Sequence, residues 1–290
     1  MPDESVAEQA KQLVSLLWRH ELPPRPGARG PKPAVSVDAV VDAAVALADR
    51  DGYAKVSIRA VAAELGLRPM SLYTYVPSKD ALTVLMVDAV AGEDTPIPAD
   101  LPVRERMAAI ARQTRAELIA HPWLLEVSLW RQVIGPGRMR RYERQLAAID
   151  GIGLPDVELD RVIAVLSEFA TGNARVAVGA QRDTQAMTDQ QWWEVHGPLL
   201  TQAMPSSLFP LSSRVGQAAG ELYQAPADPD DAFDYGLDRL LDGILGDRRT
   251  PEHTGSGGGE GGAAGGGGVC CLVGVFSPVR GLGEGGSGVR

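Results

Sequence analysis

The residues of this chain that could do chemistry are gathered in the segment SIRAVAAELGLRPMSLYTYVPSKDAL, from Ser57 to Leu82. The segment combines hydroxyl, phenol and cationic side chains, which are groups that donate hydrogen bonds to DNA phosphates and base edges. An apolar stripe at helical spacing opens the segment, and Gly66 follows it where a helix could end in a left-handed residue. We predict two short helices joined by a tight turn, the second running from about Pro69 to Val76 and entering the major groove.

Outward aromatic side chains on so short a helix are hard to explain by burial alone. Tyr73 and Tyr75 could pack inside a small domain, but the whole motif favours contact with phosphate or bases. Met70 could fill a core, or it could meet a thymine methyl group at the start of the reading helix. The predicted DNA-binding residues are Arg29, Lys32, Arg59, Arg68, Pro69, Met70, Ser71, Tyr73, Thr74, Tyr75 and Lys79.

The charge of the chain is unevenly distributed. The net charge is −9, yet residues 25–79 carry eight Lys or Arg against five Asp or Glu, a balance of +3 that leaves −12 for the rest. Only this end is therefore suited to meet phosphate. For Arg59 and Lys79 we favour DNA contact over solvated charge. For Arg29 and Lys32, a solubilising arm and contact with the minor groove or backbone are equally open.

Three helices must position these residues. The first is predicted between Ser36, its N-cap, and Gly52, its stop. Ser57 is placed to cap the next helix, and Ser78 to cap a later one that runs from the reading helix into the rest of the chain.

This segment resembles the TetR (tetracycline repressor-like) family of bacterial transcription regulators over roughly residues 34–91. The family pattern L-Y-x-(aromatic/His)-apolar-x-x-K-x-x-L is met at Leu72, Tyr73, Tyr75, Val76, Lys79 and Leu82. The resemblance implies an all-α fold, with an N-terminal three-helix helix-turn-helix domain joined to a larger helical ligand-binding and dimerisation domain. It also implies that the helix after the reading helix moves like a pendulum when ligand binds.

Composition divides the chain into four regions. An N-terminal helix and a basic Pro-rich arm occupy 1–33, because PPRPGARGPKP cannot be helical. The helix-turn-helix domain follows at 34–91, and the ligand-binding and dimerisation domain at 100–247. The tail, 248–290, holds 16 of the 33 glycines and is predicted to be disordered. It contains Cys270 and Cys271, and we assign it no function.

Two segments of the larger domain are predicted to form a subunit interface. Residues 162–178 are apolar on nearly every side, which predicts a helix enclosed on all sides. The last helix carries an apolar stripe at Phe233, Leu237, Leu240, Leu241 and Ile244. Doubled by a two-fold axis, the two helices would make a four-helix interface of a homodimer, which is the arrangement that the family resemblance favours.

Candidate ligand contacts are aromatic or polar residues within mostly apolar helices, and simple packing is the alternative for each. Asn173 is the sharpest, because an amide inside an apolar helix needs a hydrogen-bonding partner from a ligand or a neighbouring helix. The candidates are Trp130, Phe169, Asn173, Trp192 and His196.

The motifs favour a regulator over an enzyme. No phosphate loop, metal-binding spacing or nucleophile constellation is found, so we expect no catalytic residues, cofactor or metal. No apolar run approaches the ~20 residues of a membrane span, which predicts a cytoplasmic protein with no membrane partner. The favoured function is a ligand-responsive transcriptional repressor, a homodimer on a palindromic double-stranded DNA operator, released by a small-molecule effector. The alternatives are an enzyme or small-molecule-sequestering protein with an appended helix-turn-helix, and an effector-independent DNA-binding protein.

Overall fold

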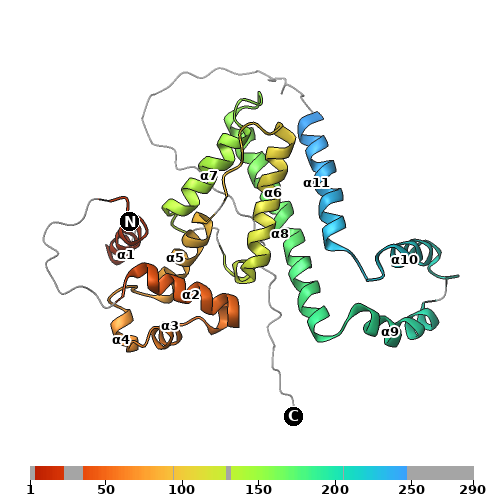
Figure 1. Ribbon diagram of the computed structural model, residues 1–290, viewed down its shortest axis with the longest axis horizontal. Helices are drawn as coiled ribbons and strands as arrows, with labels where there is room; N and C mark the ends of the chain where they lie inside the picture. Colours follow the sequence, from red (N-terminus) through yellow and green to blue (C-terminus); the bar gives the residue numbers. More distant parts are fainter. Residues whose placement is uncertain (1–3, 23–34, 94, 129–131, 205, 247–290) are drawn as a thin grey trace, which may run out of the picture.

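The computed structural model describes residues 4–22, 35–93, 95–128, 132–204 and 206–246, and Figure 1 shows that every regular element in these ranges is a helix. The predicted all-α fold is confirmed. The basic arm with Arg29 and Lys32, the candidate Trp130 and the Gly-rich tail lie outside the described residues. The elements are α1 (Glu4–Leu17), α2 (Val37–Asp51), η1 (Tyr53–Lys55), α3 (Ile58–Glu64), α4 (Pro69–Leu72), α5 (Lys79–Gly92), α6 (Val103–Ala120), η2 (Pro122–Glu126), α7 (Pro136–Ile149), α8 (Asp156–Ala186), α9 (Asp189–Ala203), α10 (Pro210–Tyr223) and α11 (Pro229–Gly246).

Serine caps begin three helices of the helix-turn-helix domain, α2–α5, as predicted. Each serine Oγ accepts a hydrogen bond from a backbone N–H in the first turn, a group that the helix itself leaves unpaired. The bonds run from Ala39 to Ser36 at 3.0 Å, from Ala60 to Ser57 at 3.1 Å and from Ala81 to Ser78 at 3.1 Å.

The turn between α3 and α4 also follows the sequence, but the reading helix is shorter than predicted. Gly66 has a φ of +66°, the left-handed conformation that glycine adopts at low cost. Helix α4 ends at Leu72, and the next residues continue as turns with hydrogen bonds between residues three apart. Pro77 then disfavours helical geometry at Val76, the residue before it.

The first core lies beneath α2–α5. Its fully buried side chains include Val40, Val61 and Leu82. The same core also holds buried residues from outside the domain, among them Leu17 of α1, which is 2% exposed, and Trp123 of η2, which is 1% exposed, together with Leu118 of α6 and Ala174 of α8. The helix-turn-helix domain therefore shares its core with α1, α6, η2 and α8.

The second core joins α6, α7, α8 and α11. The apolar stripe of α11 is used here, since Phe233, Leu237 and Leu241 are at most 3% exposed within one protomer. The prediction that Leu241 faces a partner is therefore wrong. The reason is the close approach of α11 to α8, where a Cβ added at Gly236 would lie 2.7 Å from the ring of Phe169.

The outer face of α8 is open in the protomer. Val165 is 41% exposed and Val176 is 56% exposed, so residues 162–178 are enclosed on one side only. Helix α8 continues past the second core to α9 and α10, which lie apart from both cores at the right of Figure 1. Large apolar side chains on these two helices are 57% to 71% exposed, namely Trp193, Val195, Leu199, Leu211 and Leu222, with Val215 at 56%.

Candidate nucleic-acid interface and its connection to the larger domain

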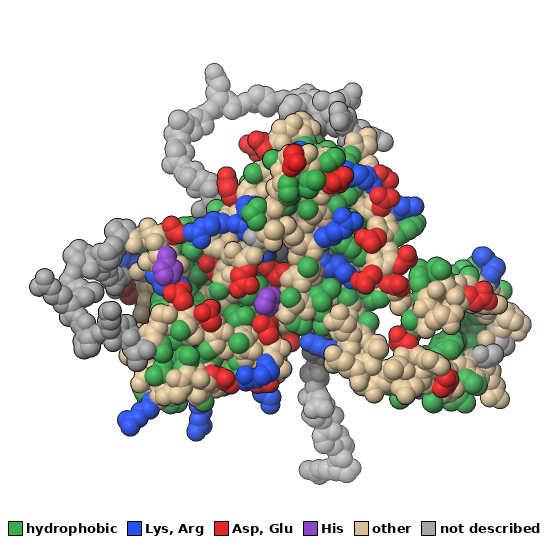
Figure 2. Space-filling view, viewed as in Figure 1, with side chains coloured by type: hydrophobic (Ala, Val, Ile, Leu, Met, Phe, Trp, Pro, Cys, Tyr) green, Lys and Arg blue, Asp and Glu red, His purple; other side chains and the backbone are tan. Residues whose placement is uncertain are grey.

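The outer surface of α3 and α4 gathers most of the predicted DNA contacts. Met70 is 76% exposed and Tyr73 is 48% exposed, while Leu72 between them is fully buried. Packing of Leu72 in the first core thus turns its neighbours outward. The other exposed candidates on this surface are Arg59, Arg68, Pro69, Ser71 and Thr74. In Figure 2, Lys and Arg side chains project from the lower edge of this domain.

Two arginines on this surface lack the ion pairs that a nearby arginine, Arg50, forms. Arg50 is neutralised by Asp51 and Glu64, at 2.9 Å and 2.7 Å. Arg59 and Arg68 form no ion pair with any residue that the structure describes. Their guanidinium groups are free to replace the counterions of DNA phosphates.

Three predicted contacts are partly engaged inside the domain. Tyr75 is half-buried and packs against the first core. The Thr74 hydroxyl donates to the Ser71 carbonyl at 2.7 Å. Lys79 is also half-buried, and its ammonium lies 4.5 Å from the centre of the Tyr53 ring. Lys79 is therefore tied to an aromatic side chain that sequence reasoning did not single out.

Tyr53 connects Lys79 to the larger domain. Its ring stacks on that of Trp123, with 6.5 Å between centroids. The Trp123 indole donates to Asp49 Oδ1 at 2.8 Å, and Nδ1 of His121 lies 2.9 Å from the same oxygen. The carboxylate of α2 thus binds two side chains at the end of α6 and in η2. We call this group the α2–η2 contact.

The sequence contains no signal for the α2–η2 contact. The pair His121-Pro122 predicts where α6 stops, but it says nothing about what the imidazole meets. Asp49 lies 74 residues away from Trp123 along the chain. No helical or strand periodicity relates side chains at such a separation.

In the larger domain, Asn173 is bonded within the protein. Its Oδ1 accepts from Arg115 Nε at 2.6 Å, and its Nδ2 donates to the Pro229 carbonyl at 2.8 Å. Arg115 also pairs with Asp230 and lies 4.9 Å from the centre of the Phe233 ring. Neighbouring helices therefore satisfy the amide and tie together α6, α8 and the start of α11.

The other ligand candidates fall into two groups. Phe169 stacks on Phe233 at 5.4 Å, beside Asn173. Trp192 and His196 lie on α9, where their rings stack at 4.4 Å and the His196 imidazole contacts the Trp192 carbonyl at 2.8 Å. The structure does not bring the two groups together within one protomer.

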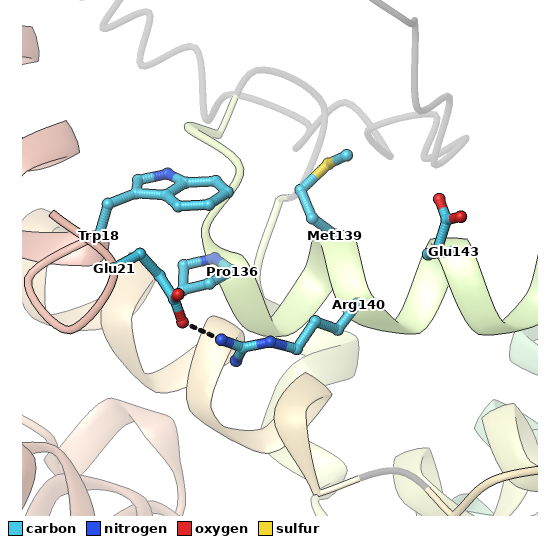
Figure 3. Close-up of a pocket in the computed structure, with 6 residues that line it drawn as sticks. All are labelled: Trp18, Glu21, Pro136, Met139, Arg140 and Glu143. Carbon is cyan, nitrogen blue, oxygen red and sulfur yellow. Dashed lines mark hydrogen bonds and ion pairs between the residues drawn. The ribbon is translucent and has the colours of Figure 1, made fainter.

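An open groove of about 250 Å³ lies elsewhere, between the end of α1 and α7 (Figure 3). The described candidates for ligand binding do not line it. Within the described ranges, no group of His, Cys, Asp and Glu side chains is arranged to hold a metal ion, and no helix is long and apolar enough to cross a bilayer.

Two family models match the chain. Residues 40–84 match the model described as bacterial regulatory proteins, tetR family, and residues 96–247 match the tetracyclin repressor-like, C-terminal domain. The first covers the helix-turn-helix and the second covers α6–α11. Helix α1 lies outside both.

Relatives and solved structures agree with these models. The HTH-type transcriptional repressor DrrR1 of Streptomyces coeruleorubidus is 39% identical over 240 residues, which span 80% of this chain and 84% of DrrR1. Apo ActR from Streptomyces coelicolor has a TM-score of 0.60 at 26% identity, covering 75% of this chain and 97% of ActR. ActR in complex with actinorhodin has a TM-score of 0.59 at 27% identity, covering 73% and 96%.

Proposed function

The chain belongs to the TetR family of bacterial regulatory proteins, and from this premise we propose that it is a homodimeric repressor that binds a palindromic operator and is released by a small molecule. The observation that carries the proposal is the open surface of α3 and α4. There Met70, Ser71 and Tyr73 are exposed beside two arginines without ion-pair partners among the described residues. Because its target is chromosomal DNA, we place its action in the cytoplasm. We propose no catalytic activity.

Repression and effector release are supported by the relatives. DrrR1 is named a transcriptional repressor, and ActR is solved both alone and with actinorhodin. A scaffold of this kind therefore takes up a small molecule in ActR. We propose that the larger domain of this chain does the same, with an effector of its own.

The homodimer is supported by the open face of α8. Val165, Gly172 and Val176 recur at helical spacing on one side, and no described atom lies within 4 Å of a Cβ built at Gly172. A second copy could approach closely there across a two-fold axis. A single helix-turn-helix reads only a few base pairs, so a dimer also supplies the two half-sites that specificity requires.

We propose that the effector pocket is completed when two protomers meet. Phe169 and Asn173 belong to one cluster and Trp192 and His196 to another, and large apolar side chains of α9 and α10 are mostly exposed in the part of the protomer that the structure describes. Burying those side chains against a second copy would remove them from water, which is favourable. It would also carry the α9 aromatics toward a core of the partner.

The α2–η2 contact offers a route from effector to DNA. Asp49 holds His121 and Trp123, which follow α6, and the Trp123 ring reaches Lys79 through Tyr53. Movement at the end of α6 would displace these side chains and the helices that carry the reader. An effector needs such a difference in contacts between two states in order to shift them.

A selection from a randomised duplex library tests the proposal. The protein should enrich a palindrome whose half-sites lie about one helical turn apart. An Arg59→Gln, Arg68→Gln double variant should lose this enrichment because phosphate contacts are removed. Arg112→Gln, which alters an exposed pair with Asp234 at 3.5 Å on the larger domain, should keep it. Enrichment of an unsymmetrical site would refute the homodimer on DNA.

Release from the operator by an effector is tested by measuring how the binding of a compound and the binding of operator affect each other. Compounds that raise the melting temperature of the protein should also weaken operator binding, because coupling between two binding sites is mutual. Stabilising compounds that leave operator affinity unchanged would favour the effector-independent alternative.

A further inference from the structure

The last residues of α1 and those that follow it connect two parts of the molecule that are far apart in sequence. Leu17 is buried in the first core, which anchors this segment on the helix-turn-helix domain. The next residue, Trp18, donates its indole N–H to the Ile134 carbonyl at 3.1 Å, in the segment that leads into α7. We call residues 16–21 the strap.

On one side the strap binds the start of α2. Arg19 forms an ion pair with Asp38, and Nε2 of His20 lies 3.1 Å from the same carboxylate oxygen. Burial by itself would raise the pKa of Asp38, but the hydrogen bonds and charges of Arg19 and His20 hold that pKa below its ordinary value. Asp38 is therefore an anion that the Arg19 guanidinium and the His20 ring stabilise.

On the other side the strap binds α7. Glu21 forms an ion pair with Arg140, and the Trp18 ring lies beside Pro136 at the first turn of that helix (Figure 3). Exposed ion pairs contribute little by themselves. The buried Leu17 and the tryptophan hydrogen bond give the strap its fixed position, and the ion pairs then select the two helices that it joins.

The start of α7 is also bound directly to α5. The carboxylate of Asp88, which is 7% exposed, accepts hydrogen bonds from the backbone N–H groups of Gly137 at 3.1 Å and Arg138 at 2.9 Å. A carboxylate at this position satisfies N–H groups that the first turn of α7 leaves unpaired. A Cβ at Gly137 would collide with the Asp88 carbonyl, so the two backbones touch.

These contacts form a closed ring. Helix α2 packs on α5, α5 caps α7, α7 pairs with the strap, and the strap pairs with α2. We propose that the strap locks the helix-turn-helix domain and the first turns of α7 into one rigid body. Effector-driven movement would then carry α5 and the first turns of α7 together, so α5 would not swing free of α7. That last step alone rests on the proposed function.

Hydrogen exchange of the full-length protein, without DNA or effector, tests the ring. Glu21→Gln releases the strap from α7, and Asp38→Asn releases it from α2. If the ring is closed, each change also loosens the side that it does not touch. In Asp38→Asn we therefore expect amides in the first turns of α7 to exchange about fivefold faster than in the parent. In Glu21→Gln we expect the same acceleration for amides of α2. Local opening sets these exchange rates.

Glu8→Gln is the matched control, since Glu8 lies on α1 and its exposed ion pair, at 3.8 Å, is with Lys11 of the same helix. It should leave both sets of amides at parental rates. The exchanged pair Glu21→Arg with Arg140→Glu should restore them. If each variant accelerates exchange only at its own contact, or nowhere, the ring is not a unit and the proposal fails. That result would not change the outcome expected from the duplex-library selection, so each proposal can be refuted without the other.

Discussion

At the scale of single residues, Tyr73 is the sharpest test of how the protein docks on DNA. Its side chain is 48% exposed, so its hydroxyl can be removed without disturbing the core. Tyr73→Phe should weaken binding to all operator variants by about 1.5–3 kcal/mol, the range for a hydrogen bond to a charged group. Fluorescence anisotropy at fixed salt measures this change. Tyr235→Phe, at an exposed position of α11, is the control and should bind as the parent does.

The role of a residue was easier to predict from the sequence when its bonding partner lies close to it along the chain. Ser36 and Ser78 were assigned as caps because the N–H group that a cap serves lies three residues away. Asn173 was recognised as needing a partner, but its choice of Arg115 and Pro229 depends on how three helices pack. The same holds for Asp49, whose partners lie at the end of α6 and in η2.

At the scale of helices, we expect charge substitutions on α8 and on α11 to have different effects on the protein. Val165→Glu with Val176→Glu would place charges on the open face of α8 and should give a folded monomer that no longer binds operator. Leu241→Glu would bury a charge in the second core and should unfold the protomer. Sedimentation and circular dichroism together separate the results. Val6→Glu, exposed on α1, should remain dimeric. A dimeric Val165→Glu, Val176→Glu protein would place the interface elsewhere.

The mistaken orientation of α11 has a physical cause. Helical periodicity shows which residues share a face, but it does not say whether that face meets another part of the same chain or a second copy. The stripe at Phe233 and Leu237 is equally suited to both. In the structure, Gly236 lets α11 approach the Phe169 ring of the same protomer.

At the scale of the whole molecule, the first core crosses the boundary between the two matched family segments. Trp123 is 1% exposed and packs with side chains of α2–α5. We therefore expect the parent to unfold in a single calorimetric transition, and Trp123→Ala to lose about 3–5 kcal/mol of stability and to split the transition in two. Trp18→Ala, a partly buried tryptophan of the strap, is the comparison and should keep one transition. A single transition in Trp123→Ala would show that η2 does not couple the domains.

The arrangement of whole segments was the least accessible part of the fold from sequence. Apolar spacing, caps and breakers predicted α2, α3, α5 and α11, but not α9 and α10 as separate helices. They did not predict the strap, because Glu21 and Arg140 are 119 residues apart and both are ordinary surface residues by type. Only the packing of α1 and α7 against α5 brings them together.

The exposed apolar side chains of α9 and α10 have a consequence for the stability of the chain in the cell. In the proposed homodimer, pairing covers Trp193, Leu199, Leu211 and Leu222, which a single protomer exposes to water. Chaperones bind exposed apolar surfaces, and proteases degrade chains that expose them. Dimerisation, which would cover these surfaces, depends on the protein concentration. At low synthesis rates we expect chains to be destroyed before they meet. The amount of active protein should then rise more steeply than its synthesis, which would give the gene it controls a threshold.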